Sequence, residues 1–296
     1  LVAPASPFRR EAFDAGVVEL RRLGFDPVFD ESVFARARHG YTAGDARHRA
    51  AAFRRAWLDP SIAALVAVRG GYGSVQMLPL LDANEFRAAP KAFIGYSDTT
   101  SLLTWLNQTV GIVAFHGPMI EGRFAAGEGG YDRDSFTRVL MARAPAGLIT
   151  HERVAAIRPG EASGILLGGT LTQLAASLGT PFAFDPPPGH ILFIDEVGER
   201  PYRVDRMLTQ LRLGGVIAKA SALVFGELPR CDEPVEGGPA IRQVVEDLVR
   251  DFDGPVLFGL PSGHTLGAAL TLPFGVRARL VTAPSAGLII EEAAVA

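Results

Sequence analysis

The chain has little of the chemistry that marks several large classes of protein. Its 296 residues include a single cysteine, Cys231, which excludes an internal disulfide framework and a zinc site built on cysteines. No apolar run reaches the roughly 20 residues that span a bilayer, and no secretory signal is visible. We therefore expect a protein of a reducing compartment without a membrane-spanning segment.

A strong charge of either sign is also lacking. The 29 Lys and Arg residues are interspersed with 32 Asp and Glu residues, for a net charge of −3. Without a basic patch or a charge block, the sequence argues against nucleic acid or a membrane surface as a partner. The metal-binding patterns H-x-x-H and H-E-x-x-H and acidic calcium loops are absent as well. We predict neither a metal nor another cofactor.

Strands and helices alternate through the first third of the chain. Apolar stretches at 1–6, 26–30, 62–68 and 91–96 are interpreted as strands, and those at 8–23, 44–57, 74–81 and 99–108 as helices. This alternation predicts an α/β fold with a parallel sheet covered on both faces. Functional loops in such sheets lie at the carboxyl ends of the strands.

The rest of the chain divides into a weakly periodic stretch and a second block. We predict an N-terminal domain over 1–130 and a linker over 131–163 with one helix near 132–142. A C-terminal domain over 164–296 should follow. Its tail alternates between apolar and polar residues, which is typical of antiparallel strands.

The stretch "KAFIGYSDTT" places Ser97 between an expected strand and an expected helix. A nucleophilic serine is often found on such a strand-to-helix turn. Gly95 fits the G-x-S-x-G pattern of that turn, but Thr99 stands where its second glycine belongs. Two interpretations therefore stay open: Ser97 is a nucleophile, or Ser97 or Asp98 caps the helix.

Glycines cluster after the third expected strand, in "RGGYG". Their backbone N–H groups could approach a ligand closely, and Gly71 and Tyr72 suit an oxyanion hole beside a nucleophile. The spacing is not G-x-G-x-x-G, and it does not follow the first strand, so a dinucleotide site is disfavoured.

A nucleophilic serine needs a histidine as base and a carboxylate that orients it. His116 and His264 both follow apolar runs, and Asp195 and Glu196 lie together towards the end of the apolar strand expected in "HILFIDEV". The order serine, acid, histidine is that of hydrolases with this turn. The alternative is that the histidines are structural and the carboxylates lie in an exposed turn.

These stretches together resemble the LD-carboxypeptidases, serine peptidases that include muramoyltetrapeptide carboxypeptidases and microcin-immunity peptidases. The matching pieces occur in family order and include "AVRGGYGSVQMLPLLD", "IGYSDTTSL", "FHGPM", "GGTLTQLAASLGTPF", "ILFIDEVGERPYRVDRMLTQL" and "FGLPSGH". The resemblance implies a Ser–Glu–His triad with Ser97 as nucleophile and His264 as base. The family's "LED" is "IDE" here, which puts Asp195 at the position of the acid and leaves Glu196 as the alternative. Strand alternation favours Asp195.

The resemblance also implies the rest of the function. The N–H of Asp98 and one from Gly71 or Tyr72 would form the oxyanion hole. The substrate would be a murein tetrapeptide that loses its terminal D-Ala, in the cytoplasm, by a homodimer without a cofactor. The implied C-terminal domain is smaller and mostly β, with the site at the domain interface. The alternatives are a microcin-immunity type of peptidase and a non-catalytic two-domain ligand-binding protein.

Overall fold

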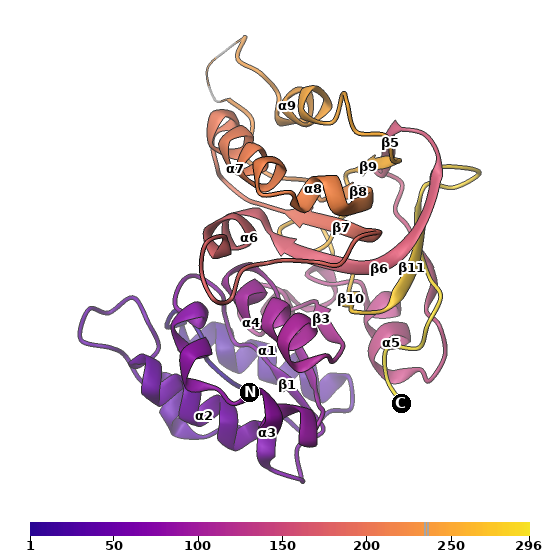
Figure 1. Ribbon diagram of the computed structural model, residues 1–296. Coiled ribbons are helices and arrows are strands. Elements are labelled where there is room, and N and C mark those ends of the chain that lie inside the picture. Colours follow the sequence, from indigo (N-terminus) through magenta and orange to yellow (C-terminus); the bar gives the residue numbers. More distant parts are fainter. Residues whose placement is uncertain (234, 236) are drawn as a thin grey trace.

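The computed structural model describes residues 1–233, 235 and 237–296. Within them the strands form two sheets, with the orders β1-β2-β3-β10 and β4-β12-β11-β6-β7-β8-β9-β5. Figure 1 shows the smaller sheet and its helices below the larger one. The two sheets share one apolar core, because Phe93 and Phe115 of the first belong to the same buried cluster as Phe193 and Val224 of the second.

The smaller sheet is the parallel sheet that the sequence predicts. β1 (Ala64–Val66), β2 (Ala92–Gly95) and β3 (Ala114–His116) run parallel. Its helices are α1 (Arg10–Arg22), α2 (Ala46–Leu58), α3 (Ala83–Ala88) and α4 (Thr100–Trp105). This confirms the α/β character of the N-terminal domain.

Local sequence explains where these helices begin and end. In α1, Phe13, Val17 and Leu20 share one buried face, and the helix ends before Gly24, whose φ of +90° favours glycine. α2 begins where the Asp45 carboxylate accepts the N–H of His48 at 2.8 Å.

Three of the expected elements differ in the structure. The first expected strand makes only one bridge, Val2 to Ala67. The stretch 26–30 forms no strand, since Pro27 has no N–H to give to a ladder. The expected helix at 74–81 is a 3-10 helix, Ser74–Leu80, with Pro79 inside it.

The larger sheet is mixed. Its parallel centre consists of β6 (Glu161–Thr170), β7 (His190–Asp195), β8 (Ala220–Phe225) and β9 (Val256–Phe258). Antiparallel strands flank this centre: β11 (Arg277–Val281), β12 (Gly287–Ile290) and β4 (Gly147–Ile149) on one side and β5 (Ala155–Arg158) on the other. All six residues of β7 are buried, as expected for a central parallel strand.

The C-terminal domain also carries helices. They are α6 (Leu171–Ser177), α7 (Pro201–Leu213), α8 (Val216–Lys219) and α9 (Ile241–Leu248). In Figure 1, α7 and α9 lie above β6 and β7, and α6 lies beside the left end of these strands, so this domain combines helices with its strands. None of the helices in the described part of the chain has the length and apolar character to cross a bilayer.

The stretch 131–163 contains more than the one expected helix. That helix is α5 (Arg133–Met141), and β4 and β5 of the larger sheet follow it. The limits of the two domains therefore stay a prediction.

One crossing of the chain brings the two sheets together. After β9, in the larger sheet, the chain returns to the smaller one, where β10 (Leu272–Phe274) pairs antiparallel with β3. His264 lies on the segment between β9 and β10. The fold therefore carries this histidine across the junction of the two sheets, where the carboxyl ends of β2, β3 and β7 lead to Ser97, His116 and Asp195.

Candidate active site

Ser97 lies on a tight turn directly after β2. Its φ is +64°, a conformation that costs a non-glycine residue of order 1 kcal/mol or more. Gly95 makes the turn possible, because a methyl group there would lie 2.5 Å from Thr99 Oγ1. Thr99 in turn donates its hydroxyl to the carbonyl of Tyr96 at 2.8 Å. Thr99, which replaces the second glycine of the pattern, thus fits because Gly95 has no side chain.

The glycine-rich loop packs directly against this serine. A Cβ on Gly70 would lie 2.7 Å from Ser97 Cβ and 2.9 Å from Ser97 Oγ, so only glycine fits. Sequence reasoning named its neighbours and missed Gly70 itself. The N–H of Tyr72 donates to Ser6 Oγ at 3.1 Å and is therefore already engaged, whereas Gly71 lies one residue from the contact with Ser97.

Asp195 and His264 form the closest acid–base pair of the site. Asp195 Oδ2 lies 2.7 Å from His264 Nδ1, and the backbone N–H of His264 donates to Oδ1 of the same carboxylate at 3.1 Å. Asp195 is fully buried, and Thr170 donates its hydroxyl to it at 3.3 Å. Burial lowers the pKa of His264, but the charge and hydrogen bond of Asp195 outweigh this, so that pKa is raised.

Glu196 points away from this pair. Its carboxylate accepts the N–H of Thr172 at 2.9 Å, the Thr172 hydroxyl at 2.7 Å and the N–H of Val197 at 2.9 Å. Thr172 lies in the first turn of α6, where N–H groups lack partners within the helix. Burial raises the pKa of Glu196 against these hydrogen bonds. The structure thus brings the Asp195 carboxylate to His264, whereas the Glu196 carboxylate binds the first turn of α6.

Contacts between the two domains place the serine turn beside this pair. The Tyr96 ring stands edge-on to the His264 ring, with centroids 5.0 Å apart. The backbone N–H of Thr170 donates to Thr100 Oγ1 at 3.0 Å. Within the described residues, His264 bonds to Asp195, and Ser97 Oγ makes no hydrogen bond. Serine–histidine contacts often tighten only when substrate binds. Tyr96 and Thr170 lie in the quoted stretches "IGYSDTTSL" and "GGTLTQLAASLGTPF", but their residue types gave no signal for these contacts.

His116 is a second histidine near the Oδ2 atom of Asp195. It is fully buried, its Nδ1 lies 3.0 Å from Ser262 Oγ, and its Nε2 lies 3.9 Å from Asp195 Oδ2. The Ser262 hydroxyl donates to the carbonyl of Leu270 at 2.8 Å, so Nδ1 of a neutral His116 donates to Ser262. Burial lowers the pKa of His116 to about 4. We interpret it as a neutral core histidine.

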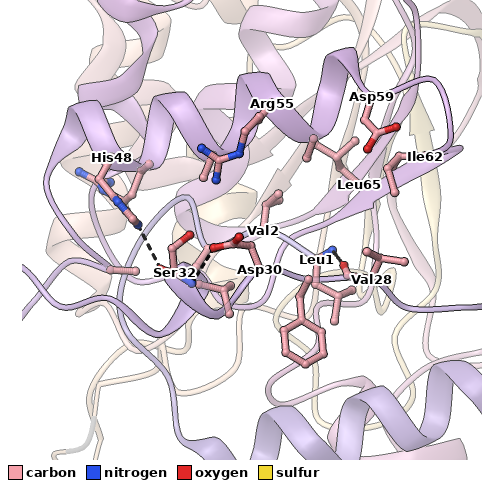
Figure 2. Close-up of a pocket in the computed structure, with 17 residues that line it drawn as sticks. Leu1, Val2, Val28, Asp30, Ser32, His48, Arg55, Asp59, Ile62 and Leu65 are labelled. Carbon is pink, nitrogen blue, oxygen red and sulfur yellow. Dashed lines mark hydrogen bonds between the residues drawn. The ribbon is translucent and has the colours of Figure 1, made fainter.

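A cavity of about 320 Å³ lies elsewhere in the N-terminal domain (Figure 2). Leu1, Val28, Asp30, His48 and Arg55 are among the residues that line it. Ser97, Asp195 and His264 are not in its lining, so this cavity is separate from the candidate site.

A serine on a strained turn after a parallel strand, beside a histidine held by a buried aspartate, defines a serine hydrolase. Residues 1–117 match the LD-carboxypeptidase N-terminal domain, and residues 163–280 match the LD-carboxypeptidase C-terminal domain. The chain therefore belongs to the LD-carboxypeptidase family, and it is a serine-type carboxypeptidase.

Relatives and solved structures agree with this assignment. The murein tetrapeptide carboxypeptidase of Pseudomonas aeruginosa is 32% identical over 272 residues, 89% of this chain and 87% of that protein. The muramoyltetrapeptide carboxypeptidase from Oxalobacter formigenes superposes with a TM-score of 0.85 at 31% identity, over 99% of this chain and 98% of that one. Microcin C7 self-immunity protein MccF, in complex with aspartyl sulfamoyl adenosine, gives a TM-score of 0.89 at 25% identity, over 100% and 96%.

Proposed function

We propose that this protein removes the terminal D-Ala from murein tetrapeptide by cleaving the amide that links it to the L-centre of the diamino acid. The contact of 2.7 Å between Asp195 and His264, beside the Ser97 turn, carries the proposal. It supplies an oriented base next to a partly exposed nucleophile. The relatives named for murein tetrapeptide carboxypeptidase activity supply the substrate.

In the proposed reaction Ser97 Oγ attacks the amide carbonyl. His264 takes the hydroxyl proton on Nε2, because its Nδ1 faces Asp195, and then gives that proton to the departing amine of D-Ala. Asp195 holds the ring in this tautomer and stabilises the imidazolium. A water molecule, deprotonated by the same histidine, hydrolyses the ester on Ser97 and completes the cycle.

The negative charge on the attacked carbonyl oxygen needs donors that are already in place. We assign this role to the N–H of Asp98, which follows the nucleophile in the first turn of the 3-10 helix Ser97–Thr99. The second donor in the proposal is the N–H of Gly71, since that of Tyr72 is engaged by Ser6. Asp98 is itself fixed, because its carboxylate accepts the N–H of Ser74 at 2.8 Å.

A carboxypeptidase must also bind the terminal carboxylate of its substrate, and Arg69 suits this task. It precedes Gly70, its side chain is 45% exposed, and it lies 3.3 Å from Glu121. Arg203, another arginine that could bind a carboxylate, lies in the first turn of α7 and pairs with Glu199, which precedes that helix. A guanidinium fork matches a carboxylate, so in this proposal Arg69 contacts D-Ala.

The proposal includes the cytoplasm as compartment and a homodimer as assembly. The single cysteine, which is buried, agrees with a reducing compartment, and the homodimer follows from the family resemblance. Light scattering of the purified protein tests the dimer, and fractionation of cells that produce it tests the compartment.

The test of the activity is incubation with purified murein tetrapeptide, with D-Ala and the remaining tripeptide both quantified. We expect equal amounts of the two products. A tetrapeptide with an L-Ala terminus is the matched control and should remain intact. Absence of D-Ala release under conditions where the protein is folded would overturn the proposal.

One observation favours a second candidate, a microcin-immunity type of peptidase. Tyr72, in the glycine-rich loop, is 47% exposed, and Tyr41 is 52% exposed, with their ring centroids 6.0 Å apart. Exposed aromatic rings near a site can stack on a nucleobase. Cleavage of aspartyl sulfamoyl adenosine faster than of tetrapeptide would establish this candidate instead.

A further inference from the structure

We propose that Arg123 is a positioning residue for His264, through hydrogen bonds to the backbone of the loop that carries the imidazole. We name residues 263–267 the histidine loop. The inference rests on the proposed function, because it gives Arg123 a role only if His264 is the base. Arg123 comes from the N-terminal domain, in the stretch after β3, whereas the histidine loop follows β9 of the larger sheet.

The guanidinium of Arg123 is directed at backbone carbonyls. Its Nη2 donates to the carbonyls of Gly263 at 2.7 Å and Thr265 at 3.0 Å. Its Nη1 donates to the carbonyl of Gly267 at 2.9 Å and contacts that of Gly130 at 3.4 Å. No carboxylate of the described residues forms an ion pair with it. One side chain therefore holds three carbonyls of the histidine loop, by hydrogen bonds that its charge strengthens.

These bonds fix the backbone on both sides of the base. In the peptide group between Gly263 and His264, the carbonyl accepts a hydrogen bond from Arg123 and the N–H donates one to Asp195. The carbonyl of Thr265, one residue after the base, binds the same Nη2 atom. Gly263 has a φ of +72°, and a Cβ there would lie 2.5 Å from Asp195 Oδ2. The main chain of His264 is thus set between Arg123 and Asp195.

A second ionic group holds the other side of the histidine loop. Glu227 accepts the N–H of Leu266 at 2.9 Å and the hydroxyl of Thr265, and it pairs with Arg153 at 2.7 Å. Glu227 and Arg153 belong to the part of the chain around the larger sheet. Arg123, by contrast, hydrogen-bonds the histidine loop from the domain of the proposed nucleophile.

Arg123 also contacts the residue before the nucleophile. Its Cζ lies 5.9 Å from the centroid of the Tyr96 ring, and that ring stands against His264. One guanidinium thus contacts both the loop that carries the proposed base and the ring of the residue before the proposed nucleophile. Misplacement of a base by about 1 Å can cost about 10²-fold in rate.

The test compares Arg123→Ala and Arg123→Lys with Arg87→Ala as a matched control. Arg87 also donates to two backbone carbonyls, of Val110 at 3.0 Å and Thr109 at 2.8 Å, but it lies on α3, outside the site. We expect Arg123→Ala to lower kcat about 10²-fold with little change in KM. Added guanidinium should restore part of that loss, and Arg87→Ala should keep wild-type kcat.

Two further measurements separate positioning from folding and from substrate identity. Arg123→Lys keeps the charge but cannot reach three carbonyls with one planar fork, so its kcat should lie between wild type and Arg123→Ala. The downfield proton resonance expected for Nδ1–H of His264 needs no substrate and should broaden or vanish in Arg123→Ala. It therefore tests the inference even if tetrapeptide is not cleaved.

The opposite results would overturn the inference. These are a kcat of Arg123→Ala equal to that of Arg87→Ala, an unchanged resonance, or a loss of kcat that guanidinium does not restore. If Arg123→Ala does not fold, a wild-type kcat in Arg123→Lys contradicts the role.

Discussion

The two halves of the candidate site are built in different ways. The serine turn is fixed by neighbours within the N-terminal domain: Gly95 and Thr99 lie within two residues of Ser97, and Gly70 packs against it. His264, the proposed base, is held by distant groups, since Asp195 lies 69 residues before it in the chain. One half therefore depends on local backbone conformation and the other on the arrangement of the two domains.

This difference predicts different responses to substitution. Changes at the serine turn should act by displacing the nucleophile, with little effect on the base. Changes around the histidine should alter its protonation and orientation and should leave the turn intact.

The largest effect is expected from Asp195→Asn, which breaks the histidine half. The amide can bond to the imidazole only in the wrong tautomer, so kcat should fall by about 10⁴-fold. Asp195 raises the pKa of His264 above the ordinary 6.5, and a neutral His264 is the active form. The acid limb of kcat/KM should therefore lie above 6.5 in the wild type and move to lower pH in the variant.

Glu196→Gln is the control for this prediction. Because Glu196 binds Thr172 at the start of α6, its loss should cost about 1 kcal/mol of stability and little turnover. A larger loss of kcat in Glu196→Gln than in Asp195→Asn would reverse the assignment of the acid.

Gly70→Ala is expected to displace the Ser97 turn. Its methyl group would lie 2.9 Å from Ser97 Oγ, so the nucleophile or the oxyanion donors must move, and kcat should fall between about 10² and 10³-fold. The acid limb of kcat/KM should not move, because the base is untouched. Gly129→Ala, where the methyl meets open space, is the matched control and should keep wild-type activity.

The next prediction concerns the pH dependence of folding stability that the buried His116 causes. Its pKa is lowered by burial from 6.5 to about 4, so the unfolded chain binds its proton more readily than the folded protein does. Stability should therefore fall as pH drops from about 6.5 to about 4, by up to about 3 kcal/mol.

Denaturant unfolding of wild type and His116→Phe at several pH values measures this contribution as a difference. The difference removes the effects of His190, Glu196 and Asp98, whose pKa values are also shifted by burial. Parallel curves for the two proteins would show that His116 is not buried in its neutral form.

The smallest effect concerns the strain at the serine turn. Since Ser97 has a φ of +64°, glycine should fit that backbone better than alanine does. We expect Ser97→Gly to be more stable than Ser97→Ala by about 1 kcal/mol, measured by thermal unfolding of the two inactive variants. Equal stabilities would mean that the turn is not strained.

Local sequence predicts the elements of the N-terminal domain well, because strand, cap and glycine signals are short-range. α1, α2 and β2 lie where the periodicity places them. The pairing of β10 with β3, after the chain leaves β9, has no local signal, because the paired residues are more than a hundred positions apart.

The same limit applies to the site. Ser97, Asp195 and His264 follow apolar strands and could be proposed from the sequence together with a family resemblance. The opposite directions of Asp195 and Glu196 follow from strand alternation. The contact of Gly70 with Ser97 could not be predicted, since it depends on how two loops of the N-terminal domain pack. The contacts of Tyr96 and Arg123 with the histidine loop could not be predicted either, since they depend on how the two domains meet.

The most direct measurement is D-Ala release from murein tetrapeptide by the wild type and by Ser97→Ala, at equal concentrations of folded protein. We expect steady release by the wild type and a loss of about 10⁴-fold or more in the variant, with an unchanged unfolding transition. Release by Ser97→Ala at a rate close to that of the wild type would contradict it, because the hydroxyl would then not be the nucleophile.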